Sequence, residues 1–165
     1  MLGRQGLLSE FTWNAEGWPE FVNKSPQAAP LTDVRLMNVT DNFEGEALDL
    51  SWQWPVGNIP RLEVADNQLH LGASPARLGA IVAQRTYAAT YTTSVILDAT
   101  RLSDGTFAGL GAVGDPYNAL ALVAGDNMLQ LWHVKMGKKQ RLAHVLLEPG
   151  TSLGLRLECW GGRAC

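Results

Sequence analysis

The chain has 165 residues, of which 46% are hydrophobic and 18% are charged, and its formal net charge is −3. This length and composition predict one folded domain, or one domain plus an extension, and exclude a disordered chain. The acidic balance predicts no nucleic-acid partner, and the lack of a basic run predicts no membrane partner. The lack of an apolar run of about 18 residues predicts no membrane span. The opening residues, MLGRQGLLSEF, lack the apolar core of a secretory signal, so the chain as written is expected to be cytoplasmic.

The first 40 residues are expected to lie outside the main fold. Residues 1–22 carry several aromatic side chains in close succession, and so much apolar surface normally packs against a neighbour: Phe11, Trp13, Trp18 and Phe21. We therefore expect residues 1–22 to be the tail of a preceding module, in which the alternating run SEFTW forms one exposed strand of a larger sheet. Residues 23–40, which include NKSPQAAPLTD, are predicted to form an extended linker stiffened by proline.

Residues 41–165 are predicted to form an all-β sandwich of antiparallel strands, because short β-rich runs alternate there with turn signals. Asp66-Asn67 separates RLEVA from QLHLGA and predicts a tight hairpin. Further strands are expected in AIVAQRTY, YTTSVILDA, TFAGLGAV, YNALALVA, MLQLWHVKM, QRLAHVLL and SLGLRLECW. No long amphipathic helix is predicted. The sequence stops directly after the last of these runs, so the sandwich is expected to lack its final strands.

The run FAGLGAVG predicts a strand that has unusually little side-chain bulk. Such a strand is expected to lie against something large that approaches it closely. Trp132 and Tyr117, on neighbouring predicted strands, are the candidates for filling this space.

The titratable side chains indicate neither a catalytic pair nor a zinc site. Asp104, Asp115 and Asp126 each stand beside glycine or proline, where turn formation explains them. Cys159 and Cys165 are the only cysteines and the three histidines are scattered, so free thiols are favoured over a disulfide or a metal site.

A series of short motifs resembles one known family. The stretch Asp41–Trp54, DNFEGEALDLSWQW, joins an acidic residue and Phe to Leu-Asp and Trp-Gln-Trp, and Gln84-Arg85-Thr86 and the glycine-rich run Ala108–Leu120 follow in order. Together they resemble the C-terminal domain of two-domain glycoside hydrolase family 43 enzymes, of the β-xylosidase and α-arabinofuranosidase type. The resemblance implies a concanavalin A-like jelly-roll sandwich. It also implies that Gly3–Phe21, with its Gly-Arg and Gly-Trp-Pro, is the end of the catalytic propeller.

The candidate contact residues for carbohydrate or for a neighbouring domain are Trp52, Trp54, Gln84 and Arg85. Positions i and i+2 of a strand face the same way, so the two indoles could form a stacking platform for sugar rings; packing in the sandwich core is the alternative. Gln84 and Arg85 could make polar contacts at an inter-domain face or in a cleft, but pairing of Arg85 with a surface acid is equally plausible. By analogy with the fold alone, Asp41 could contribute to a structural calcium site, and no other cofactor is expected.

The resemblance implies a role without catalysis by this chain. Glycoside hydrolysis needs two carboxyl groups that flank one bond, and in the resembled enzymes these lie in the propeller, of which this chain contains at most the last strand. The chain is therefore expected to be an inactive accessory sandwich. It would pack on a catalytic propeller, in cis or in trans, and shape the pocket for xylan- or arabinan-derived oligosaccharides. The alternatives are a stand-alone carbohydrate-binding module that uses its exposed aromatics, and a gene fragment without function of its own.

Overall fold

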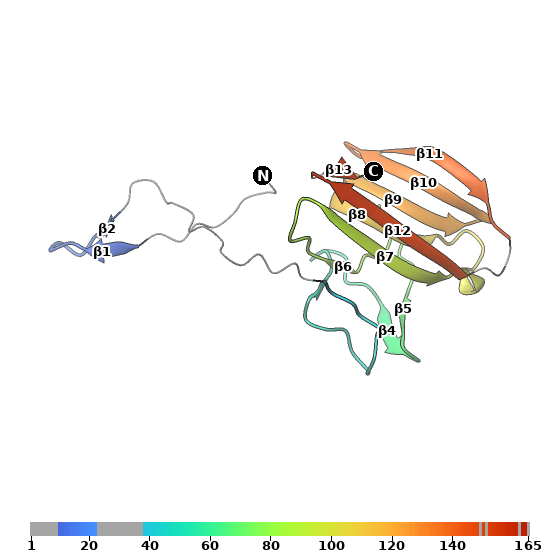
Figure 1. Cartoon of the computed structure of the whole chain (residues 1–165), viewed down its shortest axis with the longest axis horizontal. Helices are drawn as coiled ribbons and strands as arrows, with labels where there is room; N and C mark the ends of the chain where they lie inside the picture. The colour runs from blue at the N-terminus through green and yellow to red at the C-terminus, as the bar shows by residue number, and fades with distance from the viewer. Residues whose placement is uncertain (1–9, 23–37, 149, 151, 162, 165) are drawn as a thin grey trace. The chain divides into compact units, whose positions relative to one another are not determined.

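The structure is a computed structural model that describes residues 10–22, 38–148, 150, 152–161 and 163–164 (Figure 1). The chain forms two units, Met1–Val39 and Thr40–Cys165. The expected linker is largely outside the described residues, as are residues 1–9 of the expected propeller tail. No helix in the described part of the chain is long and apolar enough to cross a membrane.

The first unit contains one small hairpin. Strand β1 (Phe11–Trp13) pairs antiparallel with β2 (Pro19–Phe21), so the strand expected in SEFTW is present but forms a two-stranded sheet in the described residues. The side-chain oxygen of Asn14 accepts hydrogen bonds from two backbone N–H groups of the turn, those of Glu16 (3.0 Å) and Trp18 (2.9 Å). This Asn-based turn is a local device for reversing the chain.

The second unit is an all-β sandwich built from antiparallel strands, as the sequence predicts. One sheet has the order β11-β10-β9-β8, with β8 at Ala108–Asp115, β9 at Asn118–Gly125, β10 at Met128–Lys135 and β11 at Lys138–Leu146. The other has the order β13-β12-β7, with β7 at Tyr91–Asp98, β12 at Ser152–Trp160 and β13 at Arg163–Ala164. Figure 1 shows β7 and β12 as a layer over the four-stranded sheet, with β10 and β11 on the side away from β7.

Two short pairs of strands and one helical turn complete the unit. The pairs are β3 (Trp52–Gln53) with β6 (Ala83–Gln84), and β4 (Leu62–Ala65) with β5 (Gln68–Leu71). The helical turn is η1 (Ala99–Arg101).

Strand β6 is much shorter than the run AIVAQRTY predicts. Its partner β3 ends at Gln53, and Pro55 follows shortly after it in the sequence. Proline has no N–H to donate to a ladder, so the pairing does not continue on the side of Val82. On the side of Arg85 the opposite residues, 50–51, belong to a turn that the Trp52 N–H closes onto the Asp49 carbonyl oxygen.

Tight two-residue turns set the register of the hairpins. Asp66 and Asn67 between β4 and β5 have φ of 54° and 56°, and Asp126 and Asn127 between β9 and β10 have φ of 52° and 56°. Two successive residues with positive φ are typical of the type I′ turn, and Asn and Asp tolerate this conformation better than most residues. The predicted hairpin at Asp66-Asn67 is therefore confirmed.

The core lies under β12. Alternate residues of β12, Leu155, Leu157 and Cys159, are buried, while Arg156 between them is exposed. Period-two burial of this kind is expected where one face of a sheet lies on another layer and the opposite face contacts water.

The glycines of β8 lie against backbone, not against a bulky side chain. A methyl group added at Gly109 would clash with the carbonyl oxygen of Leu122 on β9 and would lie 2.7 Å from the Cα of Val123. A methyl group at Gly111 would lie 2.8 Å from the carbonyl oxygen of Leu120. The expectation that Trp132 or Tyr117 fills the space over this strand is therefore wrong, because it is the β9 main chain that approaches so closely.

Candidate functional site

The predicted contact residues gather around Trp52 at the start of the sandwich. The indole Nε1–H of Trp52 donates a hydrogen bond of 2.6 Å to Oδ2 of Asp41, and the other carboxylate oxygen of Asp41 accepts one of 2.7 Å from the backbone N–H of Phe43. Hydrogen bonds to an ionised carboxylate are among the stronger ones in proteins. Asp41 therefore ties the loop that precedes β3 to the ring of Trp52.

Phe43 packs against the ring of Trp52. Its ring lies 5.8 Å from the ring of Trp52, with an interplanar angle of 32°. Phe43 has φ of 55°, which is unusual for an aromatic residue and is held in place by the bond from its N–H to Asp41. Trp52 is half-buried and engaged through both its ring and its N–H, so its surroundings are those of a structural residue.

The remaining candidates lie next to this cluster. Gln84 is directly opposite Trp52 in the β3–β6 ladder, and its Nε2 donates to Oγ of Ser51 at 3.3 Å. Arg85 is exposed, and its side chain has no ion-pair partner among the described residues. Trp54 lies beyond the end of β3 and is 42% exposed. Of the two indoles, only that of Trp54 is free to offer much of its surface to a ligand or a neighbouring domain.

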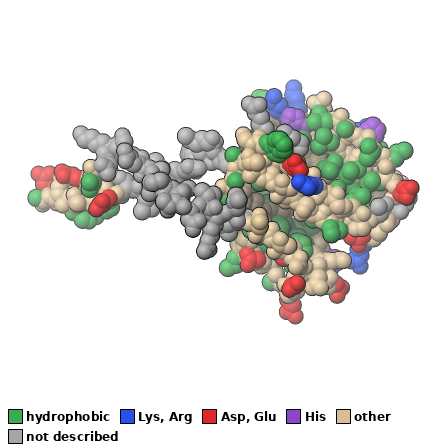
Figure 2. Space-filling model, viewed as in Figure 1, with side chains coloured by type: hydrophobic (Ala, Val, Ile, Leu, Met, Phe, Trp, Pro, Cys, Tyr) green, Lys and Arg blue, Asp and Glu red, His purple; other side chains and the backbone are tan. Residues whose placement is uncertain are grey.

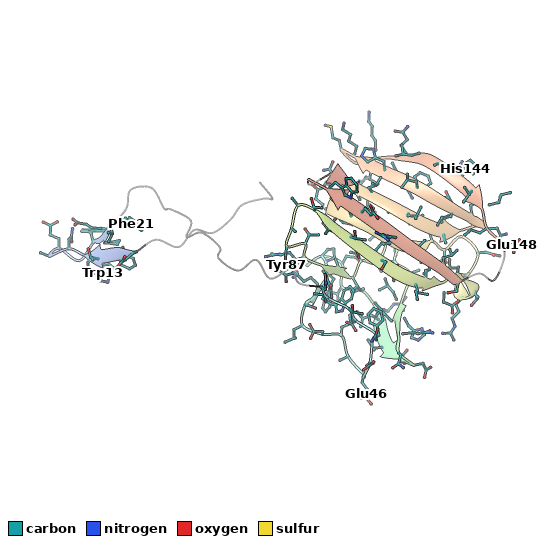
Figure 3. The ribbon with its side chains drawn as sticks, viewed as in Figure 1. Trp13, Phe21, Glu46, Tyr87, His144 and Glu148 are labelled. Atoms are coloured by element: carbon teal, nitrogen blue, oxygen red, sulfur yellow. The ribbon has the colours of Figure 1, made fainter. Side chains whose placement is uncertain are left out.

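Several large apolar side chains that lie within a few residues of β3 or β6 in the sequence face water. Leu50 is 99% and Val56 97% exposed, and Ile59 and Tyr87 are also mostly exposed. We call these four residues, together with Trp54, the β3–β6 surface; Tyr87 is labelled in Figure 3. No motif of the sequence marks the other four as a site, although Pro55-Val56-Gly57 is a turn signal that predicts an exposed Val56.

Four aspartates of the sandwich hold local turns through their side chains. Asp41, Asp49, Asp98 and Asp115 each accept a hydrogen bond from the backbone N–H two residues further on. In three of these aspartates the hydrogen bonds favour the ionised form and hold the pKa below its ordinary value of 3.8: the bonds from Ser51 at Asp49, from Thr100 at Asp98, and from Asn118 and Tyr117 at Asp115. A lowered pKa is the opposite of what a catalytic acid needs.

The described residues do not form a ready calcium site. They contain no group of three or more His, Cys, Asp or Glu side chains that could hold a metal ion. Calcium prefers six to eight oxygen ligands, and both carboxylate oxygens of Asp41 already accept hydrogen bonds. The surroundings of Asp41 therefore fit a hydrogen-bonded loop better than a metal ligand, and calcium binding stays a prediction that has its own test below.

The two-layered arrangement of antiparallel sheets makes the second unit a β-sandwich. The family model for the beta xylosidase C-terminal concanavalin A-like domain matches residues 40–163, which is most of the chain. The chain therefore belongs to this family of glycoside hydrolase family 43 domains, and the resemblance drawn from its motifs is confirmed.

Solved structures support the same fold. The chain is similar to the crystal structure of the GH43 BlXynB protein from Bacillus licheniformis, with a TM-score of 0.67 and 22% sequence identity over 93% of this chain and 33% of that one. A single-residue mutant of the same protein matches equally well. The chain thus spans about a third of the length of these relatives. A search of curated proteins returned no match.

Proposed function

We propose that this chain is the accessory β-sandwich of a family 43 glycoside hydrolase that acts on xylan- or arabinan-derived oligosaccharides. In this role it packs on the catalytic propeller and helps to shape the substrate pocket. The observation that carries the proposal is the β3–β6 surface, because a group of large apolar side chains in water is typical of an interaction site. Membership in the family indicates that the partner is the catalytic domain of a family 43 enzyme.

The chain is proposed to have no catalytic acids of its own. Hydrolysis of a glycosidic bond needs one carboxyl group kept protonated and a second one kept ionised on the other side of the bond. Asp49, Asp98 and Asp115 are exposed, hold turns and have lowered pKa values, so none of them is suited to donate a proton near neutral pH.

Association with catalytic propellers of family 43 enzymes from the same source tests the proposal. The chain should form a complex with such a propeller in size-exclusion chromatography and should release no nitrophenol from aryl xylosides or arabinofuranosides when alone. Val56→Asp combined with Tyr87→Asp should abolish the complex. Ile96→Asp is the matched control and should leave the complex intact, because Ile96 on β7 is an apolar side chain whose exposure lies between those of Val56 and Tyr87.

Two results contradict this proposal. Turnover by the chain alone shows that it carries catalytic acids. A complex that survives the double substitution, or that never forms, shows that the β3–β6 surface is not the contact.

A stand-alone carbohydrate-binding module is the second candidate, and the exposed indole of Trp54 favours it. In that case xylo-oligosaccharides should quench tryptophan fluorescence in the absence of any propeller. Trp54→Ala should remove the effect without unfolding the chain, whereas Trp160→Ala, on the exposed end of β12, should not. If the chain shows neither propeller binding nor quenching, it fits a gene fragment without function of its own.

A further inference from the structure

The hairpin of β10 and β11 carries a concentration of positive charge on an acidic chain. Residues 128–146 contain four of the chain's 13 Lys and Arg residues and none of its 16 Asp and Glu residues: Lys135, Lys138, Lys139 and Arg141. Figure 2 shows Lys, Arg and His side chains together at the top of the sandwich, where Figure 1 places this hairpin. A fifth cation, Arg77, reaches the tip of the hairpin and donates from its guanidinium to the Gly137 carbonyl oxygen at 3.4 Å.

Two of these cations are arranged around an indole. Trp132 of β10 is directly opposite Arg141 of β11, and Val134 is opposite Lys139, so these side chains share one face of the hairpin. The Nζ of Lys139 lies 4.2 Å from the centre of the Trp132 ring. This is a cation–π contact, in which the electron-rich face of the ring attracts the ammonium group.

A buried amide holds the second cation on the same face. Gln130 is 2% exposed, and its Oε1 accepts a hydrogen bond of 3.5 Å from Nη1 of Arg141. His144 is opposite Gln130, so a further nitrogen-bearing side chain lies on this face. We call Gln130, Trp132, Lys139, Arg141 and His144 the Trp132 face.

Lys139 and Arg141 of the Trp132 face form no ion pair with any residue that the structure describes. Arg156 and Glu158, on β12, do form one, at 2.6 Å. All nine residues of β11 are exposed, and β11 is the outermost strand of its sheet. At about 3.3 Å per residue such a strand offers an open edge roughly 30 Å long, which suits an extended chain better than a single small molecule.

We propose that the Trp132 face binds a carboxylate-bearing sugar chain. A sugar ring that lies against the half-buried indole brings a uronate carboxylate within reach of the Lys139 ammonium and the Arg141 guanidinium. Guanidinium and carboxylate form strong, directional hydrogen bonds, and an indole provides a flat apolar surface beside them. A nucleic acid fits less well, because its dense negative charge would be repelled by a chain of net charge −3.

This inference goes beyond the packing on a propeller proposed above. It concerns a different set of residues, and the only premise that it shares with that proposal is membership in a family of sugar-processing enzymes. Experiments can therefore refute the proposed role of the Trp132 face without refuting that of the β3–β6 surface, and the reverse.

Calorimetric titration of the whole chain tests the proposal, with two xylo-oligosaccharides of equal length as probes, one of which carries a glucuronic acid side group. The acidic probe should bind at least about tenfold more tightly, and about 0.5 M NaCl should remove most of this difference. Lys139→Gln with Arg141→Gln should weaken binding of the acidic probe by about tenfold or more. Arg61→Gln with Arg101→Gln removes the same amount of charge outside the hairpin and should change the affinity for the acidic probe less than about twofold.

The outcomes that overturn the proposal are distinct. Equal affinity for the two probes, or no binding of either, excludes recognition of the carboxylate. An equal loss in both double variants shows an effect of net charge and not of the Trp132 face. Equally tight binding of a single-stranded oligonucleotide shows general attraction of polyanions. Circular dichroism of each variant checks that the sandwich is still folded.

Discussion

The hydrogen bonds of Asp41 give the most direct prediction about stability. Asp41→Ala removes the acceptors of the Trp52 Nε1–H and of the Phe43 backbone N–H, which bond to the carboxylate at 2.6 and 2.7 Å. Hydrogen bonds to charged groups contribute roughly 1.5–3 kcal/mol each, and water can replace part of this at a site that is only half-buried. We therefore expect the free energy of unfolding to fall by about 3 kcal/mol, with a drop in Tm of about 10 °C.

Urea unfolding followed by tryptophan fluorescence measures this change, because Trp52 reports on the bond that is lost. Asp41→Asn keeps one acceptor oxygen without its charge, so it should cost about half as much as the alanine variant. Asp104→Ala changes an exposed turn residue and should stay within about 0.5 kcal/mol of the parent chain. If Asp41→Ala is as stable as Asp104→Ala, the carboxylate does not hold the loop as we argue.

The same variants test the calcium prediction. If Asp41 acts through its hydrogen bonds, then EDTA and added calcium should leave the Tm of the parent chain unchanged. A loss of stability in EDTA that matches Asp41→Ala, and that calcium restores, would mean that Asp41 is a metal ligand.

Two further predictions concern the backbone of β8 and the turn acids. Gly109→Ala should lower the free energy of unfolding by more than about 2 kcal/mol, because the new methyl group would meet the β9 main chain at Val123. Gly114→Ala should be tolerated, because its methyl group would lie 3.5 Å from its nearest neighbour. Equal unfolding curves for the two variants would contradict this account. Because hydrogen bonds lower the folded-state pKa of Asp115 from its ordinary value of 3.8, its stabilising effect is present above that pH and is lost as the pH falls below it. Asp115→Asn should therefore make the free energy of unfolding fall less steeply as the pH is lowered through the acid range. If the pH dependence of the variant equals that of the parent chain, ionisation of Asp115 does not contribute to stability.

The sequence alone determined the hairpins and the class of fold, because the signals for both are local. A turn such as Asp66-Asn67 selects residues that tolerate positive φ, and the flanking alternation of apolar and polar residues assigns each strand a face. The order of the short motifs, from DNFEGEALDLSWQW to the later glycine-rich run, also indicated the family, and the match of the family model to residues 40–163 confirms it.

Only the tertiary structure decided what the individual residues of the candidate sites do. Trp52 and Trp54 look equivalent in the sequence, but Trp52 bonds to a carboxylate 11 residues away while Trp54 stays 42% exposed, and Gln84 reaches a serine 33 residues away. Likewise, the bulge between Leu131 and Trp132 sets which side chains of β11 share a face with the indole. Such contacts depend on how separate segments of the chain meet in the folded structure, and the pattern of neighbouring residues in the sequence carries little information about that.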